Sequence, residues 1–477
     1  MISTPWAILL CKFKGDDSTP PHPRSFYEKL FTSTQKGVRS MANFFHEMSH
    51  GRLDLSGSQI FPYTDGWFTL NHTMVEFNKV KDEYLKWDAA PNPKGPAPLN
   101  SNYAFRIWAE EAATWYHPDI PKVDLTKFSG VLAVANVGVG CVGWRGSMRA
   151  ICDENTVKPS ILGQEMGHGY GLAHARIHNS LVDYLDPYDI MSTRRAFSDQ
   201  HPDYDSIGWS VAMDYGVSIG PGLNAALMDS RGWLDYSRVK KITYGEETVE
   251  LRPLHRLDLP GFLAIVVEVV SGFLAPEYMY IDKFFVEFRM NKGWDGGFNR
   301  GFGRTPGPAA PVVLIHYFEE DHSYIIKVLM NKGDKFEIKE GEHHIKIELL
   351  DIDGGKETAS ITVKHTPISV PSVTYFKFPW EYISPAIPLI PAGHGRDIAI
   401  LNERIIRKPE WSLRPILKSL ADISSSYQFM NEASDRIRQD ALQTIIRIAN
   451  QELKDLNSLE GVASPLPDWS EQSQQST

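Results

Sequence analysis

The sequence has few cysteines, no excess of basic residues and no long apolar run. It contains 49 Lys and Arg against 59 Asp and Glu, which gives a net charge of −10. Nucleic acids and anionic membranes attract basic patches, so neither is expected as a partner. No apolar run approaches the roughly eighteen residues that a membrane-spanning helix requires, so no membrane span is expected.

The three cysteines do not settle the redox compartment. Cys141 and Cys152 flank a short loop and could either form a disulfide or remain two thiols. Cys11 lies in the apolar segment Pro5–Phe13, which we expect to be the first core strand. Its thiol is therefore expected to be a small buried hydrophobic group.

A chain of 477 residues is too long for one ordinary core, and 42% hydrophobic with 23% charged residues is a globular composition. Near residue 236 the sequence changes to short β-rich runs separated by Gly, Pro and Asp, which predict an antiparallel β-sandwich. We therefore expect an α+β multi-domain fold. Its predicted parts are an α/β unit (1–235), a β-sandwich module (236–366), a Pro-rich linker (367–410), a helical region (411–456) and a disordered tail (457–477).

Hydrophobic periodicity gives a coarse prediction for the first unit. Residues 25–50 are expected to form one helix, and Gly130–Val139 a small-residue strand. Tyr103–Tyr116 is expected to be a helix whose inward side chains are Ile107, Trp108, Ala112 and Trp115.

The most informative segment is 164–174, which reads Gln-Glu-Met-Gly-His-Gly-Tyr-Gly-Leu-Ala-His. Residues four apart share a face of a helix, so Gln164 and His168 can point at one ion. A third ligand, His174, cannot come from the same straight helix. Gly169 and Gly171 are expected to adopt the positive φ that ends a helix abruptly and lets the chain turn back.

Three protein ligands leave one coordination position for water, as in catalytic zinc sites. A metal lowers the pKa of that water to about 7, and Glu165, next to the first ligand, is placed to act as general base. Met191, in the sequence Tyr-Asp-Ile-Met-Ser, follows seventeen residues after His174 and is expected under the metal. The alternative interpretation is a glycine-rich helix end with two ordinary polar histidines.

A second pattern, His-Glu-Met-Ser-His at residues 46–50, matches the zinc-binding form literally. It is followed by a strand-like run with no histidine at a suitable distance. Glu76 is the nearest candidate for a further acidic ligand. We therefore expect His46 and His50 not to bind a metal, because a five-residue motif needs its structural context.

Segment 164–174, with the turn around Met191, resembles the gametolysin-type metallopeptidases of the metzincin clan, which are related to immune-inhibitor-A-type bacterial peptidases. Members of that family carry Gln-Glu-x-x-His where other metzincins carry His-Glu-x-x-His. The resemblance implies a metzincin-like catalytic domain over residues 1–235 with Gln164, His168 and His174 as ligands of Zn²⁺, or of another divalent ion such as Cu²⁺. It also implies that the strand Gly130–Val139 runs along the edge of the substrate cleft.

The function that the resemblance implies is metal-dependent endopeptidase activity on a protein or peptide, such as a proline-rich extracellular glycoprotein. It also implies an extracellular location, although no signal peptide is visible before Trp6 and an intracellular location stays open. An amide oxygen is a poorer donor to zinc than imidazole, so Gln164 leaves a second hypothesis, a degenerate metzincin-like protein that binds peptide or glycoprotein without cleaving it. A third hypothesis is a scaffold that binds partners through residues 411–456. The oligomeric state is left open.

Overall fold

The computed structural model describes residues 1–367 except 19–21, 36–37, 64–65, 91–95, 116–120, 194, 201–217, 270–280, 300–310 and 340–342. All of them belong to one compact unit, residues 1–373, of mixed α/β structure with several sheets. The predicted linker, helical region and tail lie outside the described residues. The exception is Pro367, which ends strand β20 (Thr358–Pro367).

The first sheet has the strand order β4-β2-β6-β8-β7, with β5 also paired to β2. Its strands are β2 (Trp6–Lys12), β4 (Gln59–Phe61), β5 (Phe68–Thr69), β6 (Gly130–Ala135), β7 (Val142–Trp144) and β8 (Arg149–Asp153). All pairs are parallel except β7 with β8. The prediction that Gly130–Val139 lies at the cleft edge is therefore wrong. Its apolar residues form a central strand buried on both faces, and the edge belongs to β7.

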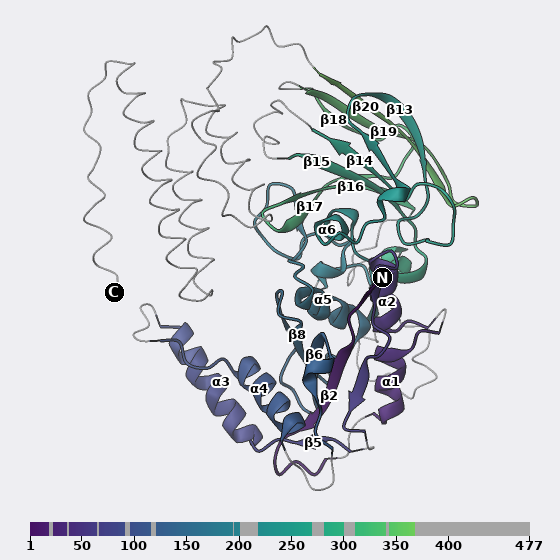
Figure 1. Cartoon of the computed structure of the whole chain (residues 1–477). Helices are drawn as coiled ribbons and strands as arrows, with labels where there is room; N and C mark the ends of the chain where they lie inside the picture. Colours follow the sequence, from purple (N-terminus) through teal and green to yellow (C-terminus); the bar gives the residue numbers. More distant parts are fainter. Residues whose placement is uncertain are drawn as a thin grey trace, which may run out of the picture. The chain divides into compact units, whose positions relative to one another are not determined.

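Side chains alternate across β2 and fill two different cores. Trp6, Ile8 and Leu10 belong to a core with residues of α1 (Arg24–Thr32), α2 (Met41–Met48) and α5 (Pro159–Gly169). The residues between them pack with residues of α3 (Met74–Asp88) and α4 (Ser101–Thr114). Figure 1 shows α1 and α2 on one side of the sheet and α3 and α4 on the other. The expected core strand and the burial of Cys11 are confirmed.

The helix predictions need three corrections. Residues 25–50 form two helices, because the Ser40 hydroxyl accepts a hydrogen bond from Asn43 N (3.1 Å) and starts a new one. In α4 the inward face holds Ala104, Phe105, Ala109 and Ala113, while the predicted inward residue Trp115 is 55% exposed. Helix α3 was not predicted, although Thr73 and Glu76 form its capping box.

A second pair of sheets follows. One has the order β12-β14-β15-β16-β17-β9 and the other β13-β20-β19-β18, and residues of both form one core. The bounds are β9 (Arg176–Ile177), β12 (Val239–Ile242), β13 (Gly245–Leu251), β14 (Ala264–Glu268), β15 (Lys283–Arg289), β16 (Val312–Glu319), β17 (His322–Leu329), β18 (Lys335–Ile338) and β19 (His343–Asp353). Most pairs are antiparallel, as predicted, but β12 with β14 and β17 with β9 are parallel.

The remaining elements are short: β1 (Ile2–Ser3) paired with β3 (Leu53–Asp54), β10 (Asp199–Gln200) paired with β11 (Ser218–Ile219), helix α6 (Ala225–Ser230), and the 3₁₀ turns η1 (Leu125–Lys127), η2 (Ile190–Ser192), η3 (Tyr236–Arg238) and η5 (Gly293–Asn299). Among the helices of the described residues, none combines the length and apolarity needed to cross a membrane.

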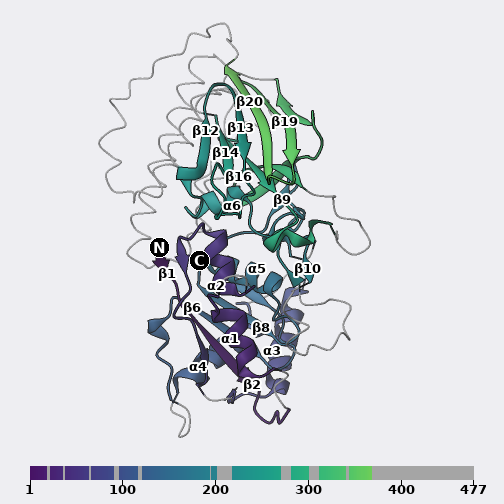
Figure 2. The same cartoon turned by 90° about the vertical axis from the view of Figure 1, so that its right-hand side faces the viewer.

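The two predicted units are joined without a break at residue 235. Strand β9 comes from the segment just after α5 but pairs with β17 of the second part. Figure 2 shows β9 beside the strands of that part. Val239, Leu263 and Phe285 belong to the same core as Trp6. The β-strands after residue 235 therefore contribute directly to the surroundings of α5.

Candidate metal centre

Helix α5 lies directly against the turn that contains Met191. Pro159 occupies its first turn, where a missing N–H costs nothing. A Cβ atom on Gly163 would lie 3.1 Å from Ile190, and one on Gly167 would lie 2.9 Å from the sulfur of Met191. Glycines four apart thus give the helix a flat face on which η2 packs, and Met191 is fully buried there.

The chain leaves α5 through the expected glycine turn. Gly171 has a φ of +94°, which confirms its predicted role. The prediction for Gly169 is wrong, because this residue stays helical. A Cβ atom there would lie 2.9 Å from the ring of Trp6, so close packing with the first strand explains the glycine.

The turn brings His168 and His174 together. Their Nε2 atoms lie 3.0 Å apart. Nδ1 of His168 is hydrogen-bonded to the carbonyl of Leu172 (2.8 Å), and Nδ1 of His174 to the carboxylate of Asp183 (2.9 Å). Both rings thus donate through Nδ1, so in the neutral tautomer each Nε2 carries a lone pair, and the two Nε2 atoms face each other. Burial lowers the pKa of His168 to about 4, so its ring is neutral at pH 7, the form that binds metals.

Asp183 fixes the imidazole of His174 through its Nδ1 atom. One of its oxygens binds His174 and the other accepts a hydrogen bond from Nε of Arg176 (2.7 Å). Burial alone would raise the pKa of Asp183, but these two hydrogen bonds outweigh it and the pKa is lowered. A carboxylate that orients a metal-ligating histidine is a common outer-shell arrangement.

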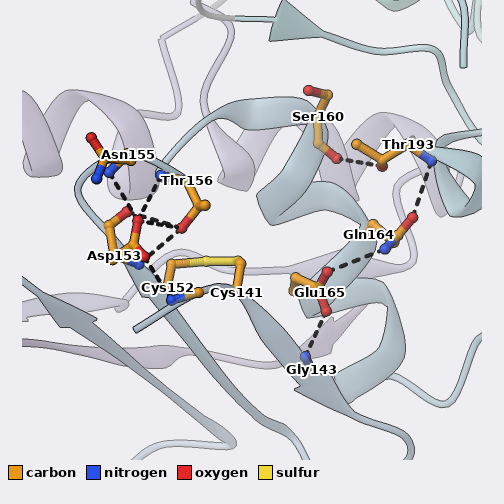
Figure 3. Close-up of a disulfide and its surroundings, with 11 residues drawn as sticks. Cys141, Gly143, Cys152, Asp153, Asn155, Thr156, Ser160, Gln164, Glu165 and Thr193 are labelled. Carbon is orange, nitrogen blue, oxygen red and sulfur yellow. Dashed lines mark hydrogen bonds between the residues drawn. A yellow bond between two sulfur atoms is a disulfide. The ribbon is translucent and has the colours of Figure 1, made fainter. Parts of the chain in front are cut away.

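Figure 3 shows how Gln164 is held. Its amide oxygen accepts a hydrogen bond from Thr193 N (3.0 Å), and its amide nitrogen donates to Oε1 of Glu165 (3.1 Å). These partners fix which amide atom is oxygen. Gln164 and Glu165 are buried, 6% and 7% exposed. Of the three predicted ligands, the structure therefore brings the two imidazoles together and binds the amide to Thr193 and Glu165.

Edge strand β7 contacts the predicted general base. The backbone N–H of Gly143 in β7 donates to Oε2 of Glu165 (2.6 Å), as Figure 3 shows. Just before β7, Cys141 forms a disulfide with Cys152 of β8. The sequence left open whether these two cysteines form a disulfide or remain thiols, and the structure contains the disulfide.

The turn around Met191 is built by Asp189. One oxygen of its carboxylate caps Met191 N (2.7 Å), and the other accepts from Asn224 N (2.6 Å). Burial, with Asp186 nearby, raises the pKa of Asp189 to about 7. Of the two tyrosines near this turn, Tyr188 packs in the core, and Tyr184 lies against the ring of His174 with centroids 4.0 Å apart.

The second histidine pattern is not arranged as a metal site. His46 is exposed near the end of α2, whereas His50 follows the helix with a φ of +49°. Nε2 of His50 pairs with the carbonyl of Leu254 (3.1 Å), and Nδ1 accepts from Asp235 N (3.1 Å). Both ring nitrogens are thus used in linking α2 to later segments, and Glu76 caps α3 instead of acting as a ligand.

Comparisons with models of protein families, with curated proteins and with solved structures find no match to this chain. Within the described ranges, no group of three or more His, Cys, Asp or Glu side chains is placed to hold a metal ion. The candidate centre has only two such ligands, and its third is an amide.

Sequence reasoning missed three residues of the centre, Gly143, Asp183 and Thr193. Of the three, Asp183 had the clearest signal in the sequence, because it is an acidic residue nine positions after His174 in a polar turn segment. Gly143 and Thr193 act through their backbone N–H groups, which every residue except proline has, so their side chains carried no signal.

Proposed function

We propose that the protein is a metal-dependent endopeptidase. The observation that carries this proposal is the pair of Nε2 atoms 3.0 Å apart, with His168 and His174 each held through Nδ1. Two nitrogens on a tetrahedral zinc ion, with Zn–N bonds of 2.0–2.1 Å, lie about 3.3 Å apart. The pair therefore fits one ion after a small adjustment, and both rings present the lone pairs that an ion requires.

Gln164 can complete the ligand set because an amide oxygen has two lone pairs. The hydrogen bond from Thr193 uses one and leaves the other for an ion. Two imidazoles and one oxygen suit Zn²⁺ or Cu²⁺. When bound, the ion supplies Lewis acidity, which polarises a carbonyl oxygen and lowers the pKa of water.

The residues of this chain supply the other parts of the reaction. Glu165 takes a proton from the attacking water and passes it to the leaving amine, because its carboxylate is the acid–base group next to the ligands. Gly143 and Gln164 orient that carboxylate through their N–H groups. These features, and the resemblance to gametolysin-type peptidases, favour peptide bonds as the substrate.

The test compares peptide cleavage by the wild type and by Glu165→Gln, each with zinc and with a chelator. Cleavage that requires metal and is lost in Glu165→Gln supports the proposal. Equal cleavage by both proteins contradicts it. Glu154→Gln is the matched control, because Glu154 is also 7% exposed and the same substitution is made outside the centre.

The second candidate is a protein that binds peptide or glycoprotein without cleaving it. It is favoured by the hydrogen bonds that engage both ends of the Gln164 amide. Metal analysis distinguishes the two functions. About one zinc or copper ion per chain together with cleavage favours the peptidase, whereas no bound ion and no cleavage after either metal is added favours the binding protein.

A further inference from the structure

The segment after His174 joins the second part of the chain. Two residues later it becomes β9, which pairs in parallel with β17 in the register Tyr324 with Arg176. Nη1 of Arg176 donates to the hydroxyl of Tyr324 (3.3 Å), while its Nε holds Asp183 (2.7 Å). A continuous chain of hydrogen bonds thus runs from Tyr324 through Arg176 and Asp183 to the imidazole of His174 (2.9 Å).

We propose that Tyr324 is a positioning residue for the metal centre, acting through Arg176 and Asp183 to fix the ring of His174. This inference rests on the proposed function in that it assigns His174 as a metal ligand. It gives the β-strands after residue 235 a role in the site. They hold the third ligand in place, and the first unit alone lacks that support.

The rigidity of Tyr324 supports this role. Its ring is 5% exposed and stacks on Tyr317 of β16, with centroids 4.9 Å apart and planes 9° apart. Both tyrosines belong to the core shared by the two later sheets. A hydroxyl on a ring locked in this way is a fixed acceptor, so it limits the positions that the guanidinium of Arg176 can take.

The carboxylate of Asp183 links the position of Arg176 to the orientation of His174. Each of its oxygens has a different partner, so the carboxylate cannot rotate without losing either Arg176 or His174. Its hydrogen bond to Nδ1 selects the imidazole tautomer with a free Nε2 and sets the direction of that lone pair. If Arg176 lost its support from Tyr324, the ring of His174 would sample more orientations and the affinity for an ion would fall.

The experiment measures the zinc dissociation constant of the full chain by competition with a chromogenic chelator. Asp183→Asn is expected to weaken binding roughly 10–100-fold, and Tyr324→Phe by a smaller factor of about three or more. In a double-mutant cycle, Tyr324→Phe should cause no further loss in the Asp183→Asn background, because its effect passes through that carboxylate. The visible spectrum of the cobalt-loaded protein should change in the same variants.

Tyr317→Phe is the matched control, since it removes a hydroxyl of equal size from the neighbouring strand; that hydroxyl pairs with His178. It should keep the zinc affinity of the wild type, and thermal unfolding confirms that all variants fold. Unchanged affinity in Tyr324→Phe overturns the inference, as does an equal loss in Tyr317→Phe. Tight, Tyr324-dependent zinc binding without peptide cleavage supports the inference and overturns the proposed function instead.

Discussion

The backbone N–H of Gly143 donates a 2.6 Å hydrogen bond to the carboxylate of Glu165, which joins the edge strand to the helix that carries the candidate ligands. The two backbones also approach closely, because a Cβ atom on Gly143 would lie 2.0 Å from the carbonyl oxygen of Glu165. Only glycine allows this approach. The position of Glu165, the proposed general base, therefore depends on a residue that has no side chain.

Gly143→Ala is expected to push β7 away from α5. Overpacking of this kind costs about 1–3 kcal/mol of the free energy of unfolding, and displacing a catalytic group by about 1 Å can cost about 100-fold in rate. The measurements are urea unfolding and kcat/KM for a peptide. Gly138→Ala is the control, because its Cβ would meet nothing nearer than 4.0 Å. Wild-type values for both variants would show that the contact is unimportant.

Gln164→His tests whether the amide limits the affinity for zinc. Imidazole is a better zinc donor than an amide oxygen, so we expect a lower zinc dissociation constant in the variant. The substitution also removes the hydrogen bond from Thr193, and such a bond typically contributes about 1 kcal/mol to the free energy of unfolding. Gln59→His, at an exposed position of β4, adds a histidine away from the centre and should not change zinc binding. Weaker binding in Gln164→His would contradict this prediction.

The first strand, the glycine turn and the burial of Met191 could be predicted because each leaves a direct mark on the sequence. An uninterrupted apolar run predicts β2, and a glycine between the two histidines predicts the turn at Gly171. The prediction of one helix over residues 25–50 overlooked the polar stretch at residues 32–37, where no apolar residue continues the helical spacing. Only the cap at Ser40 marks the start of the second helix.

The surroundings of the centre could not be predicted, because they depend on contacts between distant segments. Arg176 lies 148 positions before Tyr324, and Glu165 lies 22 positions after Gly143. Strand order is likewise a property of the sheet as a whole. The run at Gly130–Ala135 reads as a strand from its composition, but its central place follows from pairing with both β2 and β8.

The disulfide between Cys141 and Cys152 predicts a dependence of stability on redox state. Closing a loop with a sequence separation of 11 stabilises the fold by about 3 kcal/mol on the chain-entropy estimate. Urea unfolding with and without a reductant should show this difference for the wild type. The variant with both cysteines changed to serine should match the reduced wild type and ignore the reductant. The Cys11→Ala variant should still lose stability when the reductant is added, because Cys11 is a free thiol and takes no part in the disulfide.

Glu154 predicts how stability depends on pH. Burial raises its pKa from 4.5 to about 7, although the hydroxyl of Tyr27 donates to it. Because its folded pKa is the higher one, the folded protein binds more protons than the unfolded chain between these values. Its contribution is therefore complete below about pH 4.5 and lost as the pH rises through 7, on the order of 3 kcal/mol. Glu154→Gln should reduce this slope when unfolding free energies are compared at pH 5 and pH 8, leaving the part that Asp189 contributes through its own raised pKa. Glu83→Gln, exposed on α3, should keep the full slope. The same slope in Glu154→Gln as in the wild type would assign the pH dependence to another group.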